Sequence, residues 1–359
     1  MRRINFKIDS YQVSRVLLGP AFAILISLVI GWLFLAVQGY SPEKVYRAML
    51  EGAFGSTYSI SETLVKAIPI MLTALAASLS FKVKLWNIGA EGQLYLGAFA
   101  ATGIAFWFPQ LSPALLLPAM LVAGCLAGVV WNLIPGFLRA FWGINETITT
   151  LMFNYLGIIW VDYFIFGPWK DPKSNFPLSP RLTENTYLPV LGDTRVHLGL
   201  AAAILVAVLL WWLIKYSKWG YEVRVMGESQ ESARYAGIDT VKNIVLVMAI
   251  SGGIAGIAGM TEVAGVTHRL QHGLSPGYGY TGLIVAWLAR LNPLAVIVVS
   301  FLFGGLLVGG FSAQGVGAPY SLVSILQGLI LFFLLGADFI AERYLAVFRQ
   351  KKKGGEINE

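Results

Sequence analysis

The chain has 359 residues, of which 57% are hydrophobic and only 13% are charged, and its net charge is +7 at pH 7. Soluble globular proteins carry about 25% charged residues, so this composition excludes an ordinary soluble domain. The single cysteine, Cys125, excludes a disulfide framework and a cysteine-based metal site. The long apolar runs do not alternate with period two, which excludes a transmembrane β-barrel.

About ten apolar segments are long enough to predict transmembrane helices, and together they define an all-α bundle in one domain, residues 1–359. In chain order the predicted spans are 17–37, 60–80, 88–108, 114–134, 146–166, 197–215, 243–264, 277–290, 294–312 and 320–340. The first span follows a basic stretch but is too long for a signal peptide, and no small-residue cleavage pattern closes it. We therefore expect it to be retained.

Lysine and arginine gather on one side of these spans. With a cytoplasmic N-terminus, 18 of the 26 basic residues lie in cytoplasmic segments, 7 lie outside, and Lys66 falls within the second span. Because positive residues favour the cytoplasmic side, the sequence predicts N-in and C-in topology with an even number of spans. Anionic lipid headgroups then account for the net charge, so no nucleic-acid partner is expected.

Two connecting segments are long and polar. Residues 167–196 lie outside in this topology and contain five prolines, which favours a folded or semi-rigid extracytoplasmic loop over a simple connector, with both interpretations open. Residues 216–242 lie inside. Within them, Ser229 can cap a short helix that ends at Gly237. Such a helix either docks a cytosolic partner or lies on the membrane surface.

Two parts of the chain share an order of features. Residues 87–93 lead into a helix, a turn at Pro113 and a second helix; residues 273–279 lead into the same order with a turn at Pro293. The first unit starts on the cytoplasmic side and the second outside. Units of opposite orientation are typical of inverted-repeat transporters, whose pathway lies at the repeat interface. We expect spans two to five to correspond to spans seven to ten.

Glycines four residues apart recur in the spans. The pairs are Gly124 and Gly128, Gly252 and Gly256, and Gly305 and Gly309. Such spacing lets two membrane helices approach closely, so these pairs predict helix contacts.

The segment from Asn87 to Gln93 contains Glu91 between two glycines. An ionisable group in or near a membrane is costly and usually marks a pathway or a specific partner. Asn87, Glu91 and Gln93 are therefore candidates for the lining of a substrate pathway, with Glu91→Ala expected to abolish uptake but not assembly. The alternative is that Glu91 caps the following helix through exposed amides.

A second polar group begins the fifth predicted span. Asn145 can cap that helix, and Glu146 suits its first turn. Thr147, Thr150 and Asn154 then fall on one face, which either lines a cavity or binds a neighbouring helix. Asn145, Glu146, Thr150 and Asn154 join the candidate pathway.

Two apparent motifs lack their context. The glycine pattern at residues 277–282 follows a loop and has no strand or ribose-binding acid, so it does not predict a dinucleotide site. His268 and His272 have zinc-like spacing but no third ligand. No Gly-x-x-x-x-Gly-Lys-Ser/Thr sequence is present, so the chain is not expected to bind ATP through a P-loop or to be an enzyme.

The motifs together resemble a known family. They are Lys84-Leu-Trp-Asn-Ile-Gly-Ala-Glu-Gly-Gln93, Asn145-Glu-Thr147 and the segment from Gly227 to Gly237. Over roughly residues 15–345 the chain resembles the permease subunits of bacterial ATP-binding-cassette (ABC) importers of the branched-chain amino acid and simple-sugar permease family, nucleoside-type branch. Glu228-Ser229 and Ser232-Ala233 depart from the family's coupling pattern, which leaves the specificity for the partner open.

The resemblance implies a multi-pass protein of the bacterial inner (plasma) membrane that works as a homo- or heterodimer. Two cytosolic ATPases would bind residues 227–238 and use ATP and Mg²⁺, while this chain holds no cofactor or metal. An extracytoplasmic binding protein, often a lipoprotein, would deliver a nucleoside. The residues expected to couple to the ATPase are Gly227, Glu228, Ala233, Arg234, Tyr235 and Gly237. Simple sugars, riboflavin and an ion-coupled secondary transporter remain alternatives.

Overall fold

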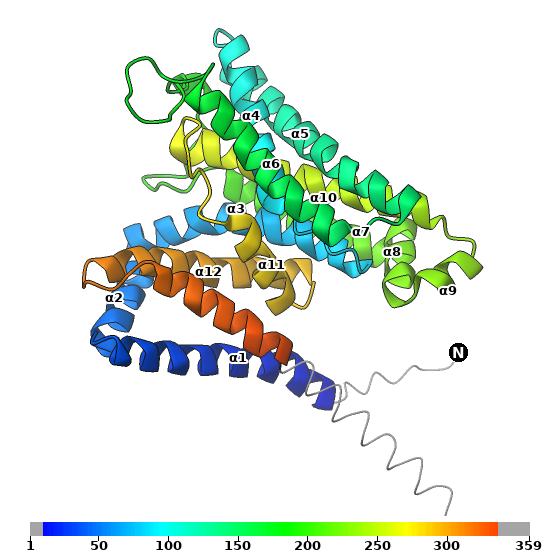
Figure 1. The fold of residues 1–359 in the computed structure, drawn as a ribbon, viewed down its shortest axis with the longest axis horizontal. Coiled ribbons are helices and arrows are strands. Elements are labelled where there is room, and N and C mark those ends of the chain that lie inside the picture. Colours follow the sequence, from blue (N-terminus) through cyan, green and yellow to red (C-terminus); the bar gives the residue numbers. More distant parts are fainter. Residues whose placement is uncertain (1–9, 337–359) are drawn as a thin grey trace, which may run out of the picture. The chain divides into compact units, whose positions relative to one another are not determined.

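The computed structural model describes residues 10–336, with side chains described from residue 22 onward. These residues divide into two compact units. One comprises the described parts of residues 1–49 and 310–359, and the other comprises residues 50–309. Among the described residues the secondary structure is helical apart from two isolated bridges (Figure 1). The predicted all-α membrane fold is therefore confirmed.

Most of the helices belong to the larger unit. Their bounds are α3 Thr57–Lys82, α4 Ala90–Trp107, α5 Pro113–Trp142, α6 Glu146–Phe166, α7 Gly199–Tyr216, α8 Lys218–Glu228, α9 Gln230–Tyr235, α10 Thr240–Glu262 and α11 Tyr278–Leu288. Helix α10 continues as the π-helix η2, Val263–Thr267. Helix α12, Pro293–Gln314, runs across the division between the units.

The smaller unit holds α1, Ser10–Val37, and an apolar helix over Ser321–Gly336. Here the Tyr46 hydroxyl donates to the Leu28 carbonyl at 2.8 Å. Helix α2, Pro42–Phe54, was not among the predicted elements, because its alternating charged and apolar residues make it amphipathic rather than continuously apolar. Residues 337–340 of the last predicted span lie outside the described residues.

Six described helices are long and apolar enough to cross a membrane: α3, α5, α6, α7, α10 with η2, and α12. Helix α6 has the predicted bounds, whereas α5 extends eight residues further than predicted and ends at Gly143 in the left-handed conformation. Helix α11 has 11 residues, too few to span a membrane alone. The short eighth span is therefore a half-helix within the bundle.

The apolar helices differ in burial. In the most apolar window of α3, 89% of residues are buried inside the chain, against 28% for α7. Helices α3, α4, α5 and α10 pack on one another, while α6 and α7 present apolar side chains outward. In Figure 1, α5 and α6 run side by side across this unit. The core is thus α3 and α10, and the least buried helices, α5, α6 and α7, form its outer, apolar edge.

The glycine pairs on α5 and α10 form a close helix crossing, as predicted. A Cβ at Gly128 would meet the Gly252 carbonyl oxygen, and one at Gly256 would meet the Gly124 carbonyl oxygen. The backbones therefore touch directly, and an alanine at either crossing would force the helices apart. Gly305 differs, since it faces the Phe54 ring instead of another glycine.

Helices α4 and α11 both begin inside the larger unit. The segment before α4 returns from the end of α3 into the bundle, where Asn87 donates to Ser251, and Ser251 donates to the α3 carbonyl of Ala76 at 2.9 Å. The N-termini of α4 and α11 meet, because a Cβ on Gly279 would meet the Glu91 backbone nitrogen. Discontinuous helices whose N-termini point at a common site are found at the binding sites of inverted-repeat transporters.

The loop 167–196 packs along the chain that follows α10. Backbone bonds join Ser179 to Leu270 and Leu188 to Ala264, each at 2.9 Å. The Trp169 ring stacks on Phe99, with 4.6 Å between the ring centroids. These contacts tie the loop to the segment between α10 and α11 and to α4, so it is folded against the larger unit.

Candidate functional site

The candidate site is built around the segment that precedes α4. Asn87 is buried, and its side chain makes three hydrogen bonds: it donates to the Ser251 hydroxyl at 3.0 Å and accepts from the Gly89 amide and the Gln93 side chain. Gln93 is also buried, and its Oε1 has no hydrogen-bond partner in the described structure. The predicted residues Asn87 and Gln93 therefore touch each other and fix the lead-in to α4.

The polar face of α6 binds this same segment. Asn154 accepts from the Gly92 amide at 2.8 Å and donates to the Ile88 carbonyl at 2.7 Å. Thr150 accepts from the Ile88 amide at 3.1 Å. Both side chains are fully buried. Of the two interpretations of this face, the geometry agrees with a helix-binding stripe.

The start of α6 is anchored in a related way. One carboxylate oxygen of Glu146 accepts from the Trp86 amide at 3.1 Å, and the other lies 3.2 Å from Nε of Arg139. Asn145 is exposed and caps the helix by accepting from the Thr147 amide at 2.9 Å. Asn145 therefore lies at the edge of the network and does not join the buried set.

Glu91 links the N-termini of α4 and α11. Its carboxylate accepts from the Gly279 amide in the first turn of α11 at 2.6 Å, and the residue is 2% exposed. Ser275 accepts from the Tyr278 amide at 2.9 Å, so two side chains satisfy the start of α11. A carboxylate at a helix N-terminus is favoured by the unpaired amides and the helix dipole. Glu91 thus caps a helix, although α11 rather than the following α4.

A second polar cluster lies among α3, α10 and α11, and we call Lys66, Glu262 and Tyr278 the charged cluster. The Lys66 ammonium donates to the Tyr278 hydroxyl at 3.0 Å and lies 4.0 Å from the Glu262 carboxylate. Glu262 is 2% exposed, and its Oε2 has no hydrogen-bond partner in the described structure. Lys66 remains about one-fifth exposed. This is a buried carboxylate held by a single, partly solvated cation.

Sequence reasoning did not assign a role to this cluster. In the sequence, Lys66 stands out only as a charge within the second predicted span. The available signal was the lysine itself, since a charged residue inside an apolar helix normally has a partner or a function. Finding the partner required knowing that α3, α10 and α11 meet.

The predicted cytoplasmic helix exists as α9. Ser229 caps it by accepting from the Ser232 amide at 3.2 Å, and Gly237 follows with φ of +75°, as predicted. Tyr235 is 94% exposed, whereas Ala233 is fully buried. Ala233 therefore anchors α9 on the chain, and Tyr235 and Arg234 are the coupling candidates on its surface.

The joint between α8 and α9 lies against the end of α3. Lys84 donates to the Glu228 carbonyl at 2.9 Å. A Cβ on Gly227 would meet the Lys82 carbonyl oxygen, so the two backbones are in contact there. Helix α9 is thus attached, through the end of α8, to the chain that leads directly to Asn87.

Helix N-termini that meet inside an all-α bundle, preceded by buried polar segments, are the arrangement expected of a membrane transport protein. A family model described as branched-chain amino acid transport system, permease component, matches residues 59–335. The chain belongs to this permease family.

Three relatives illustrate the similarity. A guanosine ABC transporter permease of Bacillus subtilis is 35% identical over 94% of this chain and 97% of its own length. A glucose ABC transporter permease of Haloferax volcanii is 34% identical over 94% and 91%. A nucleoside ABC transporter permease of Lactococcus lactis is 28% identical over 92% and 93%.

Proposed function

We propose that this chain is the membrane-spanning permease subunit of an ATP-driven importer that takes up nucleosides delivered by an extracytoplasmic binding protein. The observation that carries the proposal is the near full-length similarity to guanosine and nucleoside permeases. The plasma membrane of a bacterium is the expected location. A second permease copy or paralogue would complete the pathway.

The energy would come from a partner chain. The relatives are ABC transporter permeases, and this sequence has no P-loop. A cytosolic ATPase that uses ATP and Mg²⁺ would dock on α9 around the exposed Tyr235. The contacts of Lys84 with the end of α8 support this role, because they connect α9 to the lead-in of α4.

The charged cluster is the part of the larger unit best suited to contact a polar solute. Sugar hydroxyls donate and accept hydrogen bonds, so a ribose could donate to Oε2 of Glu262 and accept from Lys66. By contrast, the side chains of Asn87, Thr150 and Asn154 already have hydrogen-bond partners within the chain. We call these three residues and the segment they bind the Asn87–Asn154 network. Its proposed role is to hold α4 and α11 beside the pathway.

A simple sugar is the second candidate substrate, favoured by the similarity to a glucose permease. Uptake of a labelled purine nucleoside in deletion and complemented cells separates the two. We expect complementation to restore uptake. Unlabelled nucleosides should compete with this uptake, whereas ribose, glucose and riboflavin should not. Restored glucose uptake without nucleoside uptake would move the substrate to sugars.

The energy source is tested in the same cells. We expect uptake to persist when a proton ionophore is added while ATP is maintained, and to stop when ATP is depleted. Loss of uptake on ionophore addition alone would favour an ion-coupled secondary transporter.

Docking is tested at Tyr235. Tyr235→Glu places a charge at a fully exposed aromatic position of α9. We expect substrate-stimulated ATP hydrolysis of the reconstituted complex to fall about tenfold, the effect of losing one interface anchor of about 1.4 kcal/mol. Tyr235→Phe keeps the ring and serves as the control. Unchanged stimulation in Tyr235→Glu would remove α9 from the docking surface.

A further inference from the structure

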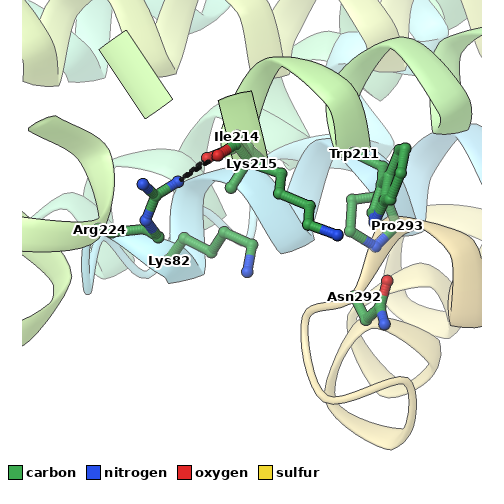
Figure 2. Close-up of a pocket in the computed structure, with 7 residues that line it drawn as sticks. All are labelled: Lys82, Trp211, Ile214, Lys215, Arg224, Asn292 and Pro293. Carbon is green, nitrogen blue, oxygen red and sulfur yellow. Dashed lines mark hydrogen bonds between the residues drawn. The ribbon is translucent and has the colours of Figure 1, made fainter. Parts of the chain in front are cut away.

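A cavity of about 490 Å³ lies among the ends of helices on the predicted cytoplasmic side of the larger unit. Lys82 from α3, Lys215 and Trp211 from α7, Arg224 from α8 and Asn292 before α12 line it. Figure 2 shows the Lys82 and Lys215 side chains extending into the same space, with Trp211 on one side and Asn292 across from them. The volume lies in the range of small-molecule sites, about 300–1,000 Å³.

The cavity concentrates positive charge without compensation. Three of the lining residues are cations and none is a carboxylate. Within the described part of the chain, no ion pair joins Lys82, Lys215 or Arg224 to an acidic side chain. Arg224 donates to the Ile214 carbonyl at the end of α7, which fixes the guanidinium at the cavity. Three cations held together with no acid between them favour an anionic ligand.

The surroundings place this charge at a lipid interface. Lys215 lies over the rings of Trp211 and Tyr216, with 4.9 and 5.2 Å between the ammonium and the ring centroids. Leu209 and Trp212 of the same helix are more than half exposed. Tryptophan and tyrosine mark the membrane–water boundary, so α7 turns an apolar face to lipid tails and ends in cations at headgroup level.

We propose that this cavity binds the phosphodiester headgroup of an anionic phospholipid from the cytoplasmic leaflet. Lys82 and Lys215 would face the phosphate, Arg224 would add charge-assisted bonds, and the exposed apolar face of α7 would receive the acyl chains. Basic pockets between transmembrane helices on the cytoplasmic side are suited to such headgroups. The inference does not depend on which solute the permease carries.

The bound lipid would also bridge α3, α7 and α8. Helix α8 precedes the proposed coupling helix α9, and α3 carries Lys66 in the charged cluster. A phosphate between Lys82 of α3 and Arg224 of α8 would neutralise the repulsion between these like charges. The lipid would thereby stabilise the cytoplasmic end of the larger unit.

The test measures lipid binding to the purified full-length protein by native mass spectrometry, with phosphatidylglycerol as the probe and phosphatidylcholine as the zwitterionic comparison. We expect the Kd for phosphatidylglycerol to rise about fivefold for Lys215→Gln and about a hundredfold for the triple variant Lys82→Gln, Lys215→Gln, Arg224→Gln, since each basic residue near an anionic surface contributes about one fivefold factor. Lys215 is exposed, so its single substitution tests the site even if the triple variant misfolds.

The matched control is Lys242→Gln, which removes an exposed lysine of the same predicted membrane side outside the cavity. It should leave phosphatidylglycerol binding unchanged. Equal loss in Lys242→Gln and Lys215→Gln would overturn the site in favour of general surface charge. Unchanged binding in both Lys215→Gln and a folded triple variant would also overturn it.

Two further arms separate the sources of the anion. Inorganic phosphate and glycerol 3-phosphate are added as soluble competitors at concentrations equal to that of the lipid. Persistent phosphatidylglycerol binding is expected, because the soluble anions lack acyl chains. Displacement by either one would assign the cavity to a free phosphate. Loss of the ATPase subunit from the triple variant, with lipid binding intact, would assign the cations to a protein contact instead.

Discussion

Two polar groups inside the larger unit differ in how completely they are satisfied. Asn154 and Thr150 direct their hydrogen bonds to the backbone before α4, at 2.7–3.1 Å. In the charged cluster, Lys66 and Glu262 are 4.0 Å apart, and one carboxylate oxygen of Glu262 has no partner in the described structure. Asn154 and Thr150 are paired within the chain, whereas the Glu262 carboxylate still has an oxygen that can accept a hydrogen bond from a ligand.

This difference separates two uses of polar residues in an apolar bundle. A fully paired network fixes one arrangement of helices, so its loss should appear as instability. A buried charge with an unused hydrogen-bonding oxygen is costly to maintain, so under the proposed function we expect a ligand to pair with it during transport. Loss of such a group should appear in uptake more than in assembly.

The largest expected effect is at Lys66. Lys66→Met leaves Glu262 without its cation, and we expect uptake to fall at least about tenfold and unfolding free energy to fall by about 3 kcal/mol, as when one partner of a buried pair is removed. The double variant Lys66→Met, Glu262→Gln removes both charges. Its stability should recover while its uptake stays low, measured by thermal unfolding and labelled uptake.

Lys44→Met, an exposed lysine of α2, is the control for charge removal. Recovery of both stability and uptake in the double variant would make the charged cluster a structural ion pair and would remove it from the pathway.

The next effect is at Asn154. Asn154→Leu leaves the Gly92 amide and the Ile88 carbonyl unpaired, at about 1–3 kcal/mol for each buried group. We expect a lower Tm and less assembled protein, while uptake per folded molecule stays within about twofold. Thr147→Ala on the same helix is the comparison, since the Thr147 backbone amide rather than its side chain bonds Asn145. Normal assembly with uptake lost would make Asn154 a pathway residue.

A smaller effect is expected for Glu91→Gln, because an amide oxygen can still accept from Gly279. Uptake and Tm of Glu91→Gln should change less than those of Asn154→Leu. Glu91→Ala should instead lower the amount of assembled protein, because it leaves an amide at the start of α11 unpaired. Both variants are compared by labelled uptake and by the yield of protein from size-exclusion chromatography. A tenfold loss of uptake in Glu91→Gln with normal yield would restore Glu91 to the pathway.

The smallest effect lies outside the membrane, at His268. Burial, followed by the nearby Arg181 and Arg195, lowers the pKa of His268 below its ordinary value of 6.5. The neutral ring stacks on Tyr187, with 3.7 Å between the ring centroids. A lowered pKa favours the neutral form in the folded state, so stability is full above about pH 6.5 and falls as the pH falls below it.

Thermal unfolding between pH 7.5 and 5 measures this effect, which we expect to be within about 1 kcal/mol. His268→Asn suits the positive φ of 55° at this position and should make the pH dependence less steep, leaving the contribution of His197, whose burial lowers its pKa to about 4. An equally steep profile in that variant would assign the titration to another group.

Much of the fold follows from the sequence because apolar length and glycine spacing are local signals. Helix α6 and the α5–α10 glycine crossing were predicted from such signals. Helix α11 was also located, but its role as a half-helix was not, because a 14-residue apolar run does not reveal whether it spans or ends inside a bundle. Amphipathic α2 has no apolar run and was missed.

The site was less predictable than the fold. The polar residues before α4 and on α6 were found because they interrupt apolar helices, yet the sequence left open whether they line a cavity or bind a helix. That choice depends on which backbone groups lie opposite them. Lys66 and Glu262 are 196 positions apart in the chain, so no spacing rule connects them.

The contact between Lys84 and Glu228 has a mechanical consequence. Only two residues separate Lys84 from Asn87, so little slack chain lies between the end of α8 and the buried lead-in to α4. A displacement of α9 would therefore be transmitted directly to that lead-in rather than being absorbed by a flexible hinge. Insertion of glycines into the 84–87 stretch would add flexible chain and would uncouple α9 from the lead-in to α4.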